Sequence, residues 1–117
     1  MLSLEHHLVG DGAAAELRLR LDGALNIATV AQARGELLQA LAAAPGAALR
    51  LDTRGVTEAD SAGAQLLVAT AAQLARDGRR ALLLPPPAVL ARVLRTLGLG
   101  DDQGSTGYAP VPAGADA

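Results

Sequence analysis

Residues 15–21 alternate between apolar and charged side chains, with a leucine at every second position from Leu17 to Leu21. A period of two is typical of a strand that has one face on the core and the other in water. We therefore expect a strand at or near an edge of a sheet. Asp22-Gly23 is a turn signal, after which residues 24–27 are expected to return as a second strand.

The next segment repeats its apolar residues at helical spacing. Thr29 and Gln32 have the form of a capping box, in which a hydroxyl caps the helix start and a glutamine follows three residues later. The apolar series behind them predicts a helix that runs to about Ala44, where Pro45-Gly46 ends it.

Two further helices follow the same logic. The second is expected to start near Ser61 and to end at residues 76–78, where a cation precedes a glycine. The third is expected to start near Pro87 and to end at Gly98, because its apolar residues follow a spacing of three, four and seven. Both helix ends carry clear stop signals.

Apolar runs at residues 47–52 and 80–84 precede these two helices and are typical of buried strands. The resulting order, β-β-α-β-α-β-α, predicts an α/β fold with a four- to five-stranded mixed sheet and helices largely on one face. Residues 100–117 have no periodicity and are rich in Gly, Pro, Asp and Ala. We expect one domain over residues 1–99 and a flexible tail over 100–117, in which a few residues could pair at a sheet edge.

Composition narrows the classes of function. With 117 residues, a net charge of −2 and a pI near 5.5, the chain has no basic footprint for a nucleic acid or an anionic membrane. It has no cysteine, its start lacks the cations of a secretory signal, and no apolar run approaches the roughly 18 residues needed to span a bilayer. We expect a cytoplasmic protein, a monomer or weak homodimer, with no nucleic acid partner and no membrane insertion.

Ser61 is the main candidate for chemistry, because it is the one hydroxyl at the start of the second helix. It can cap that helix, act as a nucleophile or accept a phosphate group. As a cap it would contribute roughly 1 kcal/mol. As a phosphate acceptor it would gain charge beside Asp60 and Glu58.

The sequence argues against an enzyme. The nucleophile elbow G-x-S-x-G requires glycine on both sides of the serine, but Ala59 stands at one of those positions and Gly63 at the other. The histidines, His6 and His7, have no carboxylate partner at useful spacing. No dinucleotide or phosphate-loop motif is present, and we expect no cofactor and no metal.

The span from about Ala14 to Leu99 resembles the STAS family, which includes bacterial anti-sigma factor antagonists and the cytoplasmic ends of sulfate transporters. Three stretches carry the resemblance: residues 49–57 with Leu49-Arg50-Leu51-Asp52 and Gly55-Val56-Thr57; the tetrad Asp60-Ser61-Ala62-Gly63; and Pro87-Ala88-Val89-Leu90 with Val93-Leu94 and Leu97-Gly98-Leu99. The D-S-x-G tetrad at the start of the second helix, at this distance from the L-x-L-D strand, is a fairly specific signal.

The resemblance implies a function for the same tetrad. It implies that a partner serine kinase, which doubles as the anti-sigma factor, phosphorylates Ser61, and that Asp60 shapes the site. Only the unphosphorylated form would then bind the partner and free the sigma factor. The expected partner-binding residues around this loop and helix are Arg54, Thr57, Glu58, Asp60, Ser61, Ala62, Gly63 and Gln65.

The resemblance also fits a second type of STAS protein. Glu58, Ala59, Ala62 and Ala64 depart from the usual residues of the family. Residues 25–29 and 61–67 are more similar to STAS proteins of chemotaxis clusters and to the small accessory subunit of phospholipid-transport ABC systems. In that case the chain would dock on the ATPase of such a transporter through the same helix, and Ser61 would be a contact or a cap.

Overall fold

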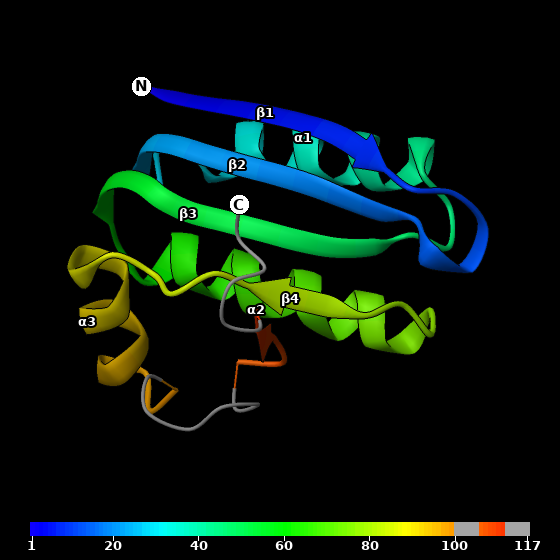
Figure 1. Ribbon diagram of the computed structural model, residues 1–117. Coiled ribbons are helices and arrows are strands. Elements are labelled where there is room, and N and C mark those ends of the chain that lie inside the picture. Colours follow the sequence, from blue (N-terminus) through cyan, green and yellow to red (C-terminus); the bar gives the residue numbers. More distant parts are fainter. Residues whose placement is uncertain (100–105, 112–117) are drawn as a thin grey trace.

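The computed structural model describes residues 1–99 and 106–111, which form one mixed sheet with helices against it (Figure 1). The strands are β1 (Leu2–Val9), β2 (Glu16–Leu25), β3 (Ala48–Ala59), β4 (Ala81–Leu83) and β5 (Ala109–Pro110), in the order β1-β2-β3-β4-β5. β1 is antiparallel to β2, and the other neighbouring strands are parallel. A short 3-10 turn, Gly12–Ala14, joins β1 to β2.

Three helices connect the parallel strands: α1 (Val30–Ala43), α2 (Ser61–Arg76) and α3 (Ala88–Thr96). Figure 1 shows α1 and α2 side by side behind the sheet, while α3 lies at the end of the sheet and packs against β3 and α2. The predicted mixed sheet with helices largely on one face is confirmed. The opposite face of the sheet is not covered by α1 or α2.

The core lies between the sheet and the two covering helices. Because side chains alternate across a strand, the leucines at every second position of β2 and β3 all point to the same layer. The buried core residues from these elements are Leu17, Leu19, Leu21, Leu49, Leu51, Ala33, Leu37, Leu41, Ala64, Leu67, Ala71 and Leu74. Alanines at the contact positions let α1 and α2 lie close to the sheet.

The predicted turn at Asp22-Gly23 is wrong. β2 runs through it to Leu25, and the expected second strand over 24–27 is instead the end of β2 and the loop after it. The true hairpin partner is β1, which pairs Leu2 with Gly23 and which the sequence analysis missed. Gly23 is required because its φ is +100° and because a Cβ there would overlap the carbonyl oxygen of Met1.

The capping box at Thr29 does not form. Thr29 is the N-cap residue of α1, but its hydroxyl donates to the carbonyl of Ala24 at 2.8 Å and accepts from the amide of Asn26 at 3.0 Å. The amide of the Gln32 side chain donates to the carbonyl of Leu2 at 3.2 Å. The hydroxyl therefore fastens the loop before α1 to the end of β2 rather than capping the helix.

Part of the expected tail packs against the fold. Tyr108 is only 4% exposed and donates its hydroxyl to the carbonyl of Leu67 in α2 at 2.8 Å. Residues 109–110 then form β5 beside β4. The expectation that a few residues of this segment pair at a sheet edge is confirmed, and the one aromatic side chain of the protein gains both burial and a hydrogen bond there. The remaining residues of the expected tail, 100–105 and 112–117, lie outside the described residues.

Candidate functional site

Two loops meet at the edge of the sheet where the parallel strands β2 and β3 end. Leu25 and Ala59 are paired as the last residues of these strands. α1 and α2 start directly after them, so that the amino termini of both helices face the same edge. In open α/β sheets this edge is where binding sites usually form.

Asp60 is the N-cap of α2 and joins the two loops. Its carboxylate accepts from the amide of Gly63 at 3.1 Å and from the amide of Ile27 at 2.9 Å. The bonds from these amides, the one from Gly63 first, hold the pKa of Asp60 below its ordinary value. The interpretation of Ser61 as the cap is therefore wrong, because the carboxylate one residue earlier takes that position.

A second hydrogen bond joins the loop after β2 to the end of β3. The side-chain amide of Asn26 donates to a carboxylate oxygen of Glu58 at 2.9 Å, and its carbonyl oxygen accepts from the amide of Ala28 at 2.9 Å. Asn26 thus shapes its own loop and ties that loop to the end of β3. Together with Asp60 it makes the two loops one surface.

Ser61 is the first residue of α2 and its side chain is exposed. Within residues 1–99 and 106–111 its hydroxyl makes no hydrogen bond. Gln65, one helical turn later, is also exposed, and Ala62 is half-buried. A hydroxyl in this position is accessible to a partner protein or to a modifying enzyme, and the helix dipole favours negative charge there.

Gly63 is buried against β2 and offers no side chain to a partner. A Cβ at this position would overlap the carbonyl oxygen of Leu25. Its place in the D-S-x-G tetrad therefore has a packing reason: only glycine lets the first turn of α2 lie directly on the end of β2.

Arg54 and Thr57 flank this surface in different ways. Thr57 is exposed on β3, three residues before Asp60. Arg54 is also exposed, but its guanidinium donates to the carboxylate of Asp52 at 3.0 and 3.1 Å. Burial alone would raise the pKa of Asp52, but the bonds and the charge of Arg54 outweigh burial and lower it. The structure therefore brings Arg54 together with Asp52 rather than with the Ser61 hydroxyl.

Ile27, which the sequence pattern did not single out, is the most exposed large apolar side chain after Met1, with 72% of its surface accessible. It lies in the loop after β2, where its amide bonds to Asp60. The sequence signal for this exposed side chain was an isoleucine next to polar residues, but Ile27 was assigned to the expected strand over residues 24–27. We use the name Ser61 surface for Asn26, Ile27, Glu58, Asp60, Ser61 and Gln65.

Among the described residues, no group of three His, Cys, Asp or Glu side chains is placed to hold a metal ion. Over the same residues no helix is both long enough and apolar enough to cross a membrane.

Comparison with known proteins places the chain in a family. Residues 10–105 match the family model described as Mlab, STAS domain. No curated protein matches the sequence. The matched residues include all of β2, β3, β4 and the three helices.

Several solved structures share the fold. Unphosphorylated SpoIIAA, an anti-sigma factor antagonist, has a TM-score of 0.65 at 20% identity, covering 93% of this chain and 90% of that one. A putative anti-sigma factor antagonist from Thermotoga maritima has a TM-score of 0.70 at 16% identity, covering 94% and 87%. A variant of RsbS from Moorella thermoacetica with glutamate in place of a serine has a TM-score of 0.65 at 18% identity, covering 91% and 85%.

Proposed function

This chain belongs to the STAS domain family, and we propose that it is a non-catalytic protein-binding regulator whose binding is switched by phosphorylation of Ser61. The single observation that carries the proposal is the exposed Ser61 hydroxyl at the start of α2, which makes no hydrogen bond to the described residues because the adjacent Asp60 is the cap. The structural likeness to SpoIIAA and RsbS supports it at the level of the fold.

The Ser61 surface has the composition of a small docking site. Ile27 offers an apolar anchor at 72% exposure. Exposed Gln65 and Glu58 supply polar contacts at its margin. The hydrogen bonds of Asp60 and Asn26 hold both loops in place before a partner arrives, and such preorganisation reduces the cost of binding.

Phosphorylation of Ser61 would change this surface without unfolding it. A phosphate adds about −1.5 to −2 charges, which the amino terminus of α2 tolerates. A partner docked over Ile27 would, however, meet a hydrated dianion next to Asp60 and Glu58. A loss of about 4 kcal/mol at such a contact corresponds to roughly a thousandfold weaker binding.

The direct test is affinity capture from the native lysate with wild type, Ser61→Asp and Ser61→Asn as baits. The asparagine variant has the shape of the aspartate variant but no charge, so it separates charge from size. We expect wild type and Ser61→Asn to retain a serine kinase, Ser61→Asp to lose it, and mass spectrometry to find phosphate on Ser61. Equal capture of the kinase by all three baits would contradict the switch.

A second candidate function is a constitutive accessory subunit that docks on the ATPase of a phospholipid-transport ABC system. It is favoured by the match to the model described as Mlab, STAS domain, and by the resemblance of residues 25–29 and 61–67 to such subunits. In that case the same experiment would recover an ABC ATPase with every bait and no phosphate on Ser61.

A further inference from the structure

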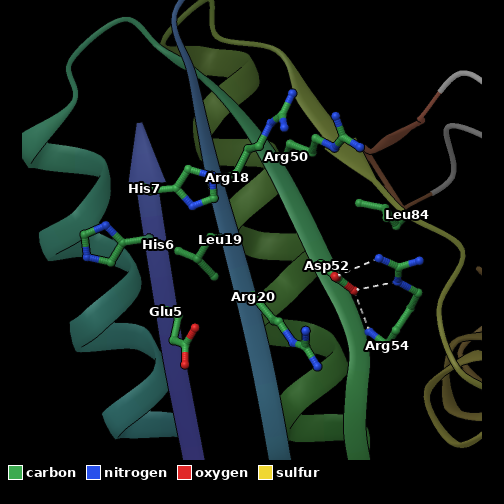
Figure 2. Close-up of a pocket in the computed structure, with 10 residues that line it drawn as sticks. All are labelled: Glu5, His6, His7, Arg18, Leu19, Arg20, Arg50, Asp52, Arg54 and Leu84. Atoms are coloured by element: carbon green, nitrogen blue, oxygen red, sulfur yellow. Dashed lines mark hydrogen bonds and ion pairs between the residues drawn. The ribbon is translucent and has the colours of Figure 1, made fainter. Parts of the chain in front are cut away.

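The face of the sheet opposite α1 and α2 contains a shallow depression of about 410 Å³ (Figure 2). It lies outside the Ser61 surface, on the middle of β1, β2 and β3. Most of its lining side chains are charged or titratable: Glu5, His6, His7, Arg18, Leu19, Arg20, Arg50, Asp52, Arg54 and Leu84. Its volume lies within the range of about 300–1,000 Å³ that is typical of small-molecule sites.

Arg50 is the unusual residue in this depression. It is only 7% exposed, although arginine is rarely buried without a close partner. Within residues 1–99 and 106–111 its guanidinium has one ionic partner, a carboxylate oxygen of Glu16 at 3.7 Å, which is too long for a hydrogen bond. Among these residues its guanidinium N–H groups donate no hydrogen bond.

The carboxylate that faces Arg50 is already shared. Arg18 donates to the same oxygen of Glu16 at 2.9 Å, so that two guanidinium groups face one carboxylate. His7 is paired with Arg18 in the β1–β2 register, and Figure 2 shows both side chains at this end of the depression. His6 lies on the other side of β1, near α1.

The other end of the depression carries no excess of positive charge. Arg20 pairs with Asp22 at 3.0 Å, and Arg54 pairs with Asp52 at 3.0 Å. Glu5 lies opposite Arg20 in the register of β1 and β2. Among the described residues, positive charge therefore exceeds negative charge at the end that holds Arg18 and Arg50, where two guanidinium groups share the carboxylate of Glu16.

We propose that this end of the depression binds the phosphate group of a small phosphate monoester, held by the guanidinium groups of Arg50 and Arg18. Planar guanidinium forks bind phosphate oxygens through paired, charge-assisted hydrogen bonds. A bound phosphate would also accept the hydrogen bonds that the buried guanidinium of Arg50 does not make to the described residues. The rest of the depression has room for the organic group of the ester.

The test uses two-dimensional NMR of the full chain titrated with inorganic phosphate, and then with glycerol phosphate, at constant ionic strength. We expect saturable shifts of the Nε–Hε signals of Arg50 and Arg18 and of the amides around them. Arg18→Gln and Arg50→Gln should each raise the dissociation constant by about tenfold or more. Tighter binding of glycerol phosphate than of phosphate would show that the organic group is recognised, whereas equal binding would identify phosphate itself as the ligand.

Arg92→Gln is the matched control, since it removes the same charge from an exposed position on α3 and should leave the dissociation constant unchanged. Arg18 is 34% exposed, so Arg18→Gln should fold even where Arg50→Gln does not. The proposal is overturned by non-saturable shifts at about 10 mM phosphate, ten times a dissociation constant of ~1 mM. It is equally overturned by an unaltered affinity of Arg18→Gln, or by equal weakening in Arg92→Gln. None of these outcomes depends on a partner binding at Ser61.

Discussion

The carboxylate of Asp60 accepts a hydrogen bond from the backbone amide of Ile27 at 2.9 Å, across 33 positions of sequence. The same carboxylate caps α2 through the amide of Gly63. One side chain therefore fixes both the loop after β2 and the start of α2, and it does so only while it is ionised and able to accept both bonds.

Replacing Asp60 by Asn should flatten the acid dependence of stability. The amide bonds lower the pKa of Asp60 in the folded protein below its ordinary value of 3.8, so the unfolded chain binds a proton more readily. The stabilisation from Asp60 is thus present above about pH 4 and is lost as the pH falls below that value. Urea unfolding of both proteins at several pH values measures this. If the free energy of unfolding had the same pH dependence in wild type and Asp60→Asn, the role of the ionised Asp60 carboxylate would be contradicted.

Gly63→Ala should destabilise the fold, because the added Cβ overlaps the carbonyl oxygen of Leu25. We expect a loss of about 1–3 kcal/mol or more, typical of overpacking at a rigid contact. Gly35→Ala is the control, since a Cβ on that exposed glycine of α1 meets nothing within 4 Å. It should stabilise the protein by about 0.5–1 kcal/mol. Urea unfolding that ranks the two variants the other way would refute this account.

Thr53→Val should stabilise the protein. The hydroxyl oxygen of Thr53 is fully buried and has no hydrogen-bond partner among the described residues, so an isosteric methyl group removes a desolvation penalty of about 1–3 kcal/mol. Thr70→Val provides the contrast, because the Thr70 hydroxyl donates to the carbonyl of Leu66 at 2.8 Å. Thermal unfolding should therefore show a higher midpoint for Thr53→Val than for Thr70→Val.

Tyr108→Phe should cost about 0.5–1.5 kcal/mol, because it removes the hydrogen bond to Leu67 and keeps the buried ring. Burial also raises the pKa of the Tyr108 hydroxyl well above its ordinary value of 10.0. The associated stability is present below pH 10 and declines as the pH rises further, since only the unfolded chain ionises readily. As Tyr108 is the one aromatic residue, its tyrosinate absorbance reports this directly. Ionisation at the pH of a free tyrosine in the folded protein would exclude the buried position.

Ile27→Ser should weaken binding of the partner captured through the Ser61 surface by about 1 kcal/mol or more, as expected for an apolar anchor. Its stability should change little, because the side chain is 72% exposed. Leu38→Ser on α1, at 45% exposure, is the control away from this surface. Equal affinities for both variants would place the partner elsewhere.

Much of the fold could be predicted from local patterns. Three kinds of signal depend on neighbouring residues alone and can be recognised in the sequence. They are the period-two leucines in β2, the helical spacing in all three helices, and the helix stops at Gly46 and Gly78. β1 was missed because only Leu2 and Leu4 of its residues are buried or half-buried, and the adjacent His6 and His7 interrupt the alternation of apolar and polar residues. Pairing of a few tail residues at a sheet edge was expected, but their position and the burial of Tyr108 could not be predicted, because a two-residue strand and one tyrosine have no periodicity.

The candidate site was predicted less completely than the fold. The sequence by itself determined that a serine stands at the start of α2 next to two carboxylates, because the strand, the loop and the helix start are contiguous in the chain. Only the tertiary structure decided that Asp60 rather than Ser61 is the cap, that Ile27 joins the same surface, and that Arg50 is buried beside a shared carboxylate. The cap is a local bond from the Gly63 amide, which the sequence leaves open between two adjacent polar residues, whereas the relationships of Asp60 to Ile27 and of Arg50 to Glu16 link residues more than 30 positions apart. The hydrogen bonds and burial that fix them arise only when distant segments pack together.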